Sequence, residues 1–173
     1  MSIKVNTKIG VGPALYEQRD WVSIVGGQWA GRWDKGIIVI SVSGARLKMF
    51  QILIFPQPDG QDSQLVVKDL ATRSDASYLL QTNDDLSAHI TTRSRGWRTG
   101  PKDVLERLND PTLADTIPAN QYKFRLTVEL ETGDERYAFL NTCLWTASGS
   151  RRLGESEFFS FGHGSFMVSH IFC

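Results

Sequence analysis

Residues 121–141, QYKFRLTVELETGDERYAFLN, have the sequence pattern of a β-hairpin. In the first arm Phe124, Leu126, Val128 and Leu130 alternate with Arg125, Thr127, Glu129 and Glu131. Strict alternation with a period of two is typical of a strand whose two faces meet different environments. Gly133 and Asp134 provide turn residues, and residues 137–144 are predicted to form the returning arm. The charged face of this strand therefore either meets water or lines a polar cavity.

Strand signals recur on both sides of this hairpin. Segments 3–9, 19–25, 37–42, 47–55, 65–82, 86–94, 157–161 and 165–172 are rich in β-branched or apolar residues and are separated by turn residues. Residues 101–109 are predicted to form the one helix, because proline suits the first helical position and Asp103 and Glu106 suit the N-terminal end. We therefore expect a mainly β fold of about eight to ten strands with one short α-helix. An antiparallel barrel is favoured over a sandwich because closure removes exposed edges.

The length and composition favour an ordinary globular protein. A chain of 173 residues fits one domain, residues 1–173. Its formal net charge is zero, which does not favour a nucleic-acid partner. No apolar run approaches the roughly 20 residues that span a membrane, and the N-terminus lacks the apolar core of a signal peptide. We expect a cytoplasmic protein, in which Cys143 and Cys173 are reduced rather than disulfide-bonded.

The sequence contains no signature of a metal or cofactor site. His89, His163 and His170 do not match a zinc-binding spacing, and the glycine-rich nucleotide fingerprint is absent. No nucleophile elbow or P-loop is present either. We therefore expect neither a metal nor a cofactor.

Several fragments, in order along the chain, resemble the domain-of-unknown-function family 3237. The fragments are SIVGGQWAG around Gly26, DASY at 75–78, RGWRTGP at 95–101, and the Phe124-Arg125, Glu131-Thr132 and RYAFLN (136–141) parts of the hairpin. Two departures stand out. Residues 46–51, RLKMFQ, do not reproduce a Gly-Ala-Asp-Trp segment that the family often carries, and Phe139 replaces a usual tryptophan.

The resemblance implies a compact antiparallel β-barrel, often dimeric, with a cavity inside. It also implies a function, because some fungal members resemble ring-closing enzymes of aromatic polyketide pathways. Those enzymes join a phenol oxygen to a prenyl alkene without a cofactor. A shared fold does not by itself carry an activity, since pathway enzymes change substrate readily.

Three polar residues are the candidate catalytic groups: Asp75, Arg125 and Glu131. A carboxyl inside an apolar barrel loses solvation, so its pKa rises and it can act as a general acid. Arg125 would hold a phenolate or carboxylate. The candidate substrate-binding residues are Trp29, Trp33, Tyr78, Trp97 and Asn141, the aromatic ones as a wall that stabilises a cation. The alternative is that Arg125 and Glu131 belong to a solvated strand face with cross-strand ion pairs.

Two functions follow from these interpretations. The first is a cofactor-independent cyclase or isomerase of secondary metabolism that closes an oxygen heterocycle on a prenylated aromatic polyketide. The second is a non-catalytic barrel that binds a small apolar ligand. In both cases the partner is a small aromatic hydrophobic molecule, with neither nucleic acid nor membrane involved, and the resemblance implies a homodimer.

Overall fold

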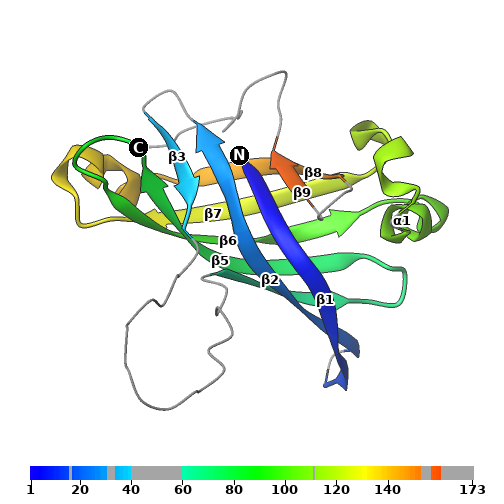
Figure 1. Ribbon diagram of the computed structural model, residues 1–173. Helices are drawn as coiled ribbons and strands as arrows, with labels where there is room; N and C mark the ends of the chain where they lie inside the picture. The colour runs from blue at the N-terminus through cyan, green and yellow to red at the C-terminus, as the bar shows by residue number, and fades with distance from the viewer. Residues whose placement is uncertain (16, 31–33, 40–59, 111, 153–156, 161–173) are drawn as a thin grey trace, which may run out of the picture.

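The computed structural model describes residues 1–15, 17–30, 34–39, 60–110, 112–152 and 157–160. The strands in this part of the chain are β1 Ser2–Ala14, β2 Glu17–Ala30, β3 Lys35–Ile38, β4 Gly60–Val66, β5 Thr72–Thr82, β6 His89–Thr99, β7 Lys123–Glu131, β8 Trp145–Arg152 and β9 Glu157–Ser160 (Figure 1). The α-helix α1 spans Lys102–Asn109, and the 3₁₀ helices η1, η2 and η3 span Ala114–Thr116, Ala119–Gln121 and Glu135–Thr142. The predicted mainly β fold with one short α-helix is confirmed.

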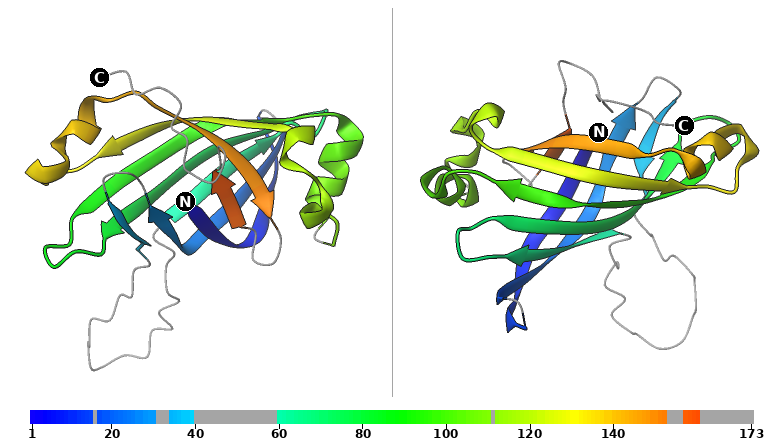
Figure 2. Two further views of the ribbon diagram at one scale, coloured as in Figure 1. Left: turned by 90° about the horizontal axis from the view of Figure 1, so that it is seen from above. Right: turned by 180° about the vertical axis from the view of Figure 1, so that it is seen from behind.

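The strands form one strongly curved antiparallel sheet that closes on itself (Figure 2). Its order is β1-β9-β8-β7-β6-β5-β3-β2-β4, and β1 also pairs with β2 while β4 also pairs with β5. Strands β3 and β4 each pair with both β2 and β5, but with different segments of them. The two short strands therefore occupy the same position in the barrel, between β2 and β5. The predicted barrel is therefore confirmed.

Alternation along the strands decides which side chains enter the barrel. On β5 the even-numbered residues are buried and the odd-numbered ones are more accessible. Ala76, Tyr78 and Leu80 join Ile90 of β6 and Val22 of β2 in the main apolar cluster. The inward face of these strands therefore builds the main core, and the opposite face is more accessible to water.

Helices close the two ends of this barrel. Figure 1 shows α1 at the right-hand end and η3 at the left-hand end. Val104, Leu105 and Leu108 of α1 pack with Ile117, Tyr122 and Phe124 in a second apolar cluster. The helix predicted over 101–109 begins one residue later, at Lys102, with Pro101 as its N-cap rather than its first helical residue.

The returning arm predicted over residues 137–144 is wrong. These residues lie in η3, and the strand that pairs with β7 is β8, with Val128 opposite Trp145. The side chain of Asp134 accepts a hydrogen bond from the N–H of Arg136 and caps this helix. Tyr137 and Leu140, three residues apart, are the buried residues of η3. Capping and a three-residue burial period outweigh the strand propensity of these aromatic residues.

The glycines near the N-terminus lie inside strands that are longer than the predicted segments 3–9 and 19–25. Strand β1 continues through Gly10 and Gly12, and β2 continues through Gly26 and Gly27. Gly26 and Gly27 have φ values of 129° and 148°, and the pairing with β1 shifts register beside them. These glycines therefore form a bulge, which bends the sheet toward closure.

Three further outcomes concern Cys143, membrane-spanning helices and two of the predicted strands. Cys143 is disulfide-bonded, so the expected reduced thiol at this position is wrong. No helix in the described residues is long and apolar enough to cross a membrane. The segments predicted as strands at 47–55 and 165–172 lie outside the described residues.

Candidate functional site

A layer of polar side chains crosses the barrel interior between the two apolar clusters. Its buried members are Asp20 of β2, Asp62 and Gln64 of β4, Thr72 and Ser74 of β5, and Thr92, Ser94 and Arg98 of β6. They stand on the same strand faces as the apolar core, at the inward positions. Buried polar groups of this kind are costly unless they are paired, and a cluster of them inside a barrel indicates a site.

Asp62 is the best-connected carboxylate of this layer, and it is only 3% exposed. Oδ1 accepts hydrogen bonds from Ser74 Oγ at 2.8 Å and from the N–H of Asp75 at 3.1 Å. Oδ2 accepts one hydrogen bond, from Gln64 Nε2 at 2.7 Å. Burial raises the pKa of Asp62 above its ordinary value, and these hydrogen bonds and the charge of Arg98 oppose that shift. The interior therefore favours the neutral carboxylic acid.

Arg98 is the cation of the layer, and it is 5% exposed. Its Nη2 donates to Thr72 Oγ1 and to Asn109 Oδ1, both at 3.1 Å. Burial lowers the pKa of Arg98 to about 10, and the nearby charge of Arg151 adds to that effect. In the described residues, Arg98 forms no ion pair with a carboxylate. A buried guanidinium thus stands within the electrostatic range of Asp62 without touching it.

Tyr78 adds an aromatic face and a hydroxyl to the same interior. It is 4% exposed, and it packs in the main apolar cluster. Burial raises the pKa of its phenol, and the charge of Asp62 contributes to that shift. The phenol is therefore neutral at physiological pH, and its hydroxyl donates to Met1 Sδ at 3.7 Å.

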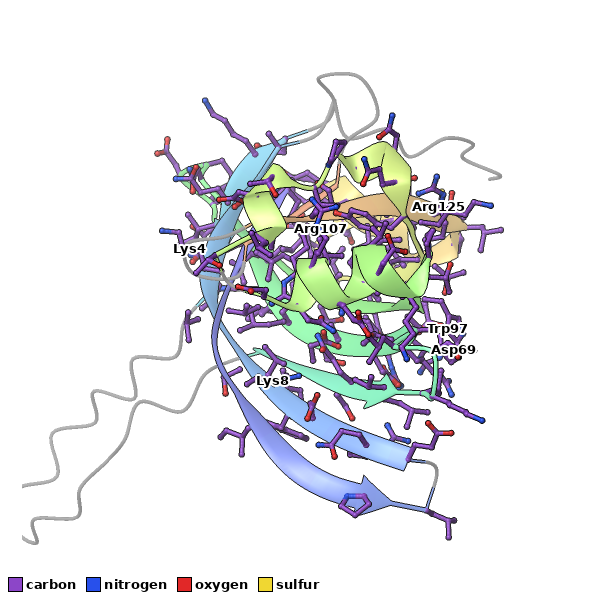
Figure 3. All side chains as sticks on the ribbon, turned by 90° about the vertical axis from the view of Figure 1, so that its right-hand side faces the viewer. Lys4, Lys8, Asp69, Trp97, Arg107 and Arg125 are labelled. Carbon is purple, nitrogen blue, oxygen red and sulfur yellow. The ribbon has the colours of Figure 1, made fainter. Side chains whose placement is uncertain are left out.

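The three predicted catalytic residues lie on the outer face of the barrel. Asp75 forms ion pairs with Arg93 at 3.2 Å and Arg95 at 3.4 Å. The hydrogen bond from Arg93 lowers the pKa of Asp75, so the raised pKa expected for an acid at this position is wrong. The exposed Arg125 lies opposite Trp97 and donates to the carbonyl oxygen of its own neighbour Phe124, at 3.1 Å. Figure 3 shows Arg125 and Trp97 along the outer side of the molecule.

A shallow pocket of about 550 Å³ lies on this outer face. Its lining residues are Gly60, Gln61, Ser77, Tyr78, Leu79, Thr91, Thr92, Arg93, Glu129 and Glu131. Glu131 is the one predicted catalytic residue that lines it. Glu129 lies 3.7 Å from Arg95, as expected for a solvated strand face. Asp75, Arg125 and Glu131 are therefore not brought together, and their catalytic roles stay predictions without the shared cavity on which they depended.

The predicted substrate-binding residues divide between the two faces. Trp29 is buried in the main apolar cluster and donates from Nε1 to the carbonyl oxygen of Gln81, at 3.1 Å. Tyr78 shares that cluster, whereas Trp97 is 42% exposed. The exposed Asn141 bonds through Oδ1 and Nδ2 to the backbone N–H and C=O of Thr132, at 2.9 Å each, so its amide fastens η3 to the end of β7. Trp33 lies outside the described residues.

Sequence reasoning did not place Asp62 and Arg98 in the buried polar layer. Asp62 lies before the strand predicted at 65–82, in a stretch of polar residues for which the sequence predicts no strand, whereas the structure has β4 there. Arg98 appears in the sequence only as part of the RGWRTGP motif, which does not reveal that its side chain is buried. The sequence does contain one indication of this layer. Thr72 and Ser74 alternate in step with Tyr78, so they share the buried face of β5 with that aromatic residue. Polar residues at core positions are unusual and indicate a functional interior.

The chemistry available in the interior is acid–base chemistry. A buried carboxyl with a raised pKa, a buried guanidinium and a neutral phenol can transfer a proton and stabilise charge in a site screened from water. In the described residues no group of three or more His, Cys, Asp or Glu side chains is placed to hold a metal ion.

Solved structures similar to this chain share its fold. A conserved protein of unknown function from Rhodopseudomonas palustris has a TM-score of 0.69 and 21% identity, over 92% of this chain and 88% of its own. A β-barrel-like protein from Acinetobacter baumannii has a TM-score of 0.65 and 25% identity, over 92% and 87%. An enzyme from Penicillium herquei has a TM-score of 0.53 and 18% identity, over 93% and 90%.

A comparison with curated proteins found no match to the sequence. The family model described as protein of unknown function (DUF3237) matches residues 1–161, which is most of the chain. The protein therefore belongs to the DUF3237 family, as its motifs predicted.

Proposed function

We propose that the protein is a cofactor-independent acid–base enzyme that works inside its barrel, with Asp62 as the acid. The observation that carries this proposal is the Asp62 carboxyl, which is buried in the interior with a raised pKa. A carboxyl group whose pKa is raised keeps its proton to a higher pH than an exposed one, which makes it a better proton donor near neutral pH. One similar structure is an enzyme, and that supports catalysis on this fold without specifying the reaction.

The reaction we propose is the closure of an oxygen heterocycle on a small prenylated aromatic substrate, such as a polyketide of secondary metabolism. The resemblance to a family with fungal members that resemble ring-closing enzymes suggests this reaction class. It suits the interior because the reaction needs only a proton and a shaped apolar wall. The product is an isomer of the substrate, so neither a cofactor nor a second substrate is required.

The proposed steps return Asp62 to its starting state. The O–H of Asp62 protonates the prenyl alkene and forms a C–H bond, which leaves a tertiary carbocation and a carboxylate. The phenol oxygen of the substrate attacks the cation and forms the ring C–O bond. The phenol proton then returns to the carboxylate of Asp62. The face of Tyr78 stabilises the cation, and folding of the substrate inside the barrel brings the reacting atoms together.

Turnover of a prenylated phenol by matched variants tests the proposal. Asp62→Asn should lower the rate by about 100-fold or more, the range of a lost general acid. Asp75→Asn removes a carboxylate of the same strand pair on the outer face, and it should keep the rate within a few-fold. Loss of turnover in Asp75→Asn with full activity in Asp62→Asn would contradict the proposal. Binding of the phenol by the wild type with no turnover would favour the ligand-binding function instead.

A further inference from the structure

Arg98 and Arg151 bring two guanidinium groups to the α1 end of the barrel interior. Both donate to the same acceptor, Asn109 Oδ1, at 3.1 Å each. Asn109 is the last residue of α1, and the backbone N–H of Arg151 donates to Tyr122 Oη at 2.8 Å. No carboxylate in the described residues pairs with either guanidinium. Two neighbouring cations that share one neutral acceptor repel each other, and an anion between them would relieve that repulsion.

Arg98 also has unused hydrogen-bond donors. A guanidinium carries five N–H donors, and both hydrogen bonds of Arg98 leave from Nη2. Its Nε is buried and has no partner in the described residues. A buried unpaired donor on a cation costs free energy, so this arrangement is better suited to a bound acceptor than to the empty protein.

The inward positions next to Arg98 carry small side chains, with the exception of Leu126. The row of paired residues across β5, β6, β7 and β8 reads Ser74, Gly96, Leu126 and Ala147. Gly96 has no room for a side chain, because a Cβ there would lie 2.8 Å from the Leu126 Cα. Leu126 keeps some accessible surface although it faces the interior, as do Val128 and Leu130 further along β7. The wall of β7 is thus apolar and open to contact beside a buried cation.

We propose that Arg98, together with Arg151, binds the carboxylate of an aromatic acid whose ring lies against the apolar wall of β7. The planar guanidinium matches a carboxylate in shape and in donor spacing. A ring against Leu126 would lie beside the small residues Ser74 and Gly96 and extend from Arg98 toward Asp62. The substrate class named here rests on the proposed function, so the substrate would be a prenylated phenol that also carries a carboxylate.

The test uses benzoate as the probe and the arginine Nε–Hε signals of the full-length protein in nuclear magnetic resonance spectra. Benzoate should move the Arg98 signal saturably and raise the melting temperature. Arg98→Met should weaken benzoate binding at least tenfold, the effect of losing one charge-assisted hydrogen bond. Arg107→Met removes an exposed charge from the last turn of α1 and should change the affinity less than twofold. If the Arg98→Met variant does not fold, the benzoate titration of the wild type decides the question. An Arg98 Nε–Hε signal that does not shift on addition of benzoate overturns the proposal.

Two further probes fix the ligand chemistry. Neutral phenol should bind more weakly than benzoate, and equal affinity would overturn recognition of an anion. Inorganic phosphate should also bind more weakly, and tighter phosphate binding would overturn the aromatic part. Benzoate binding at Arg98 without turnover of any prenylated phenol would leave this inference standing and refute the proposed function. If Arg98→Met turns over a prenylated phenol as fast as the wild type does, the proposed function stands and this inference is refuted.

Discussion

Asp62 and Asp75 should affect stability with opposite dependence on pH. The pKa of Asp62 is raised in the folded protein by burial, so the fold favours its neutral form. Stability from this group is fully present below the ordinary value of 3.8 and is lost as pH rises toward the folded-state pKa. Asp75 has a lowered pKa because of Arg93, so its contribution is present above 3.8 and is lost only as pH falls.

The magnitude follows from linkage. Between the unfolded and folded pKa of Asp62, the wild type should lose about 1.4 kcal/mol of unfolding free energy per pH unit relative to Asp62→Asn. Asparagine can keep the two hydrogen bonds at Oδ1, and the amide of Gln64 can flip to accept from the new NH₂ group. Groups other than Asp62 titrate alike in both proteins and cancel in the difference.

Urea unfolding of wild type, Asp62→Asn and Asp75→Asn from pH 4 to pH 8 measures these differences. The wild type should lose stability relative to Asp62→Asn as pH rises and level off once the folded-state pKa is passed. The difference between wild type and Asp75→Asn should stay flat above about pH 5, at the roughly 0.2–1 kcal/mol of an exposed ion pair. A flat difference for Asp62→Asn would refute the reasoning, because it would mean that Asp62 is ionised in the folded protein throughout.

Further predictions concern the frame that holds the site. Gly96→Ala should destabilise the protein by roughly 2 kcal/mol or more, because its Cβ would lie 2.8 Å from Leu126 Cα on the adjacent strand, and a thermal melt unchanged within 1 °C would contradict this. Leu140→Ala should cost about 2–5 kcal/mol in urea unfolding because Leu140 is fully buried, whereas Leu144→Ala, at a position 54% exposed, should cost well under 1 kcal/mol; equal effects would show that η3 does not anchor the barrel end. Arg136 bonds to Asp84 and Asp134 beside η3, so Arg136→Met should speed hydrogen exchange in η3 and leave β5 and β6 unchanged, while uniform acceleration across these strands would contradict a local role.

Local patterns predicted most of the fold. The alternation of β7 was predicted correctly, because a strand's side-chain period depends only on neighbouring residues. The position of α1 was correct because Pro101 marks its start. The returning arm failed because Asp134 and Arg136 stabilise a 3₁₀ helix through contacts that strand propensity ignores.

The candidate site was harder to predict, because it depends on which strands become neighbours. Asp62 gains its role from Gln64, which is close in sequence, and from Ser74, twelve residues away across the β4–β5 pair. Arg98 reaches Thr72 only through the register of β5 and β6. The alternation of charged and apolar residues on β7 is a clearer sequence pattern than any at Asp62 or Arg98. Its charged face nevertheless lies outside the barrel, as the alternative of a solvated strand face predicted.

The location of a bound ligand tests the central claim most directly, namely that the polar layer inside the barrel is the functional site. A crystal structure with a prenylated hydroxybenzoate can decide it. We predict the carboxylate at Arg98, the ring on Leu126 and the prenyl group beside Asp62. A ligand that lies instead in the outer pocket, against Arg93 and Glu131, would contradict the account.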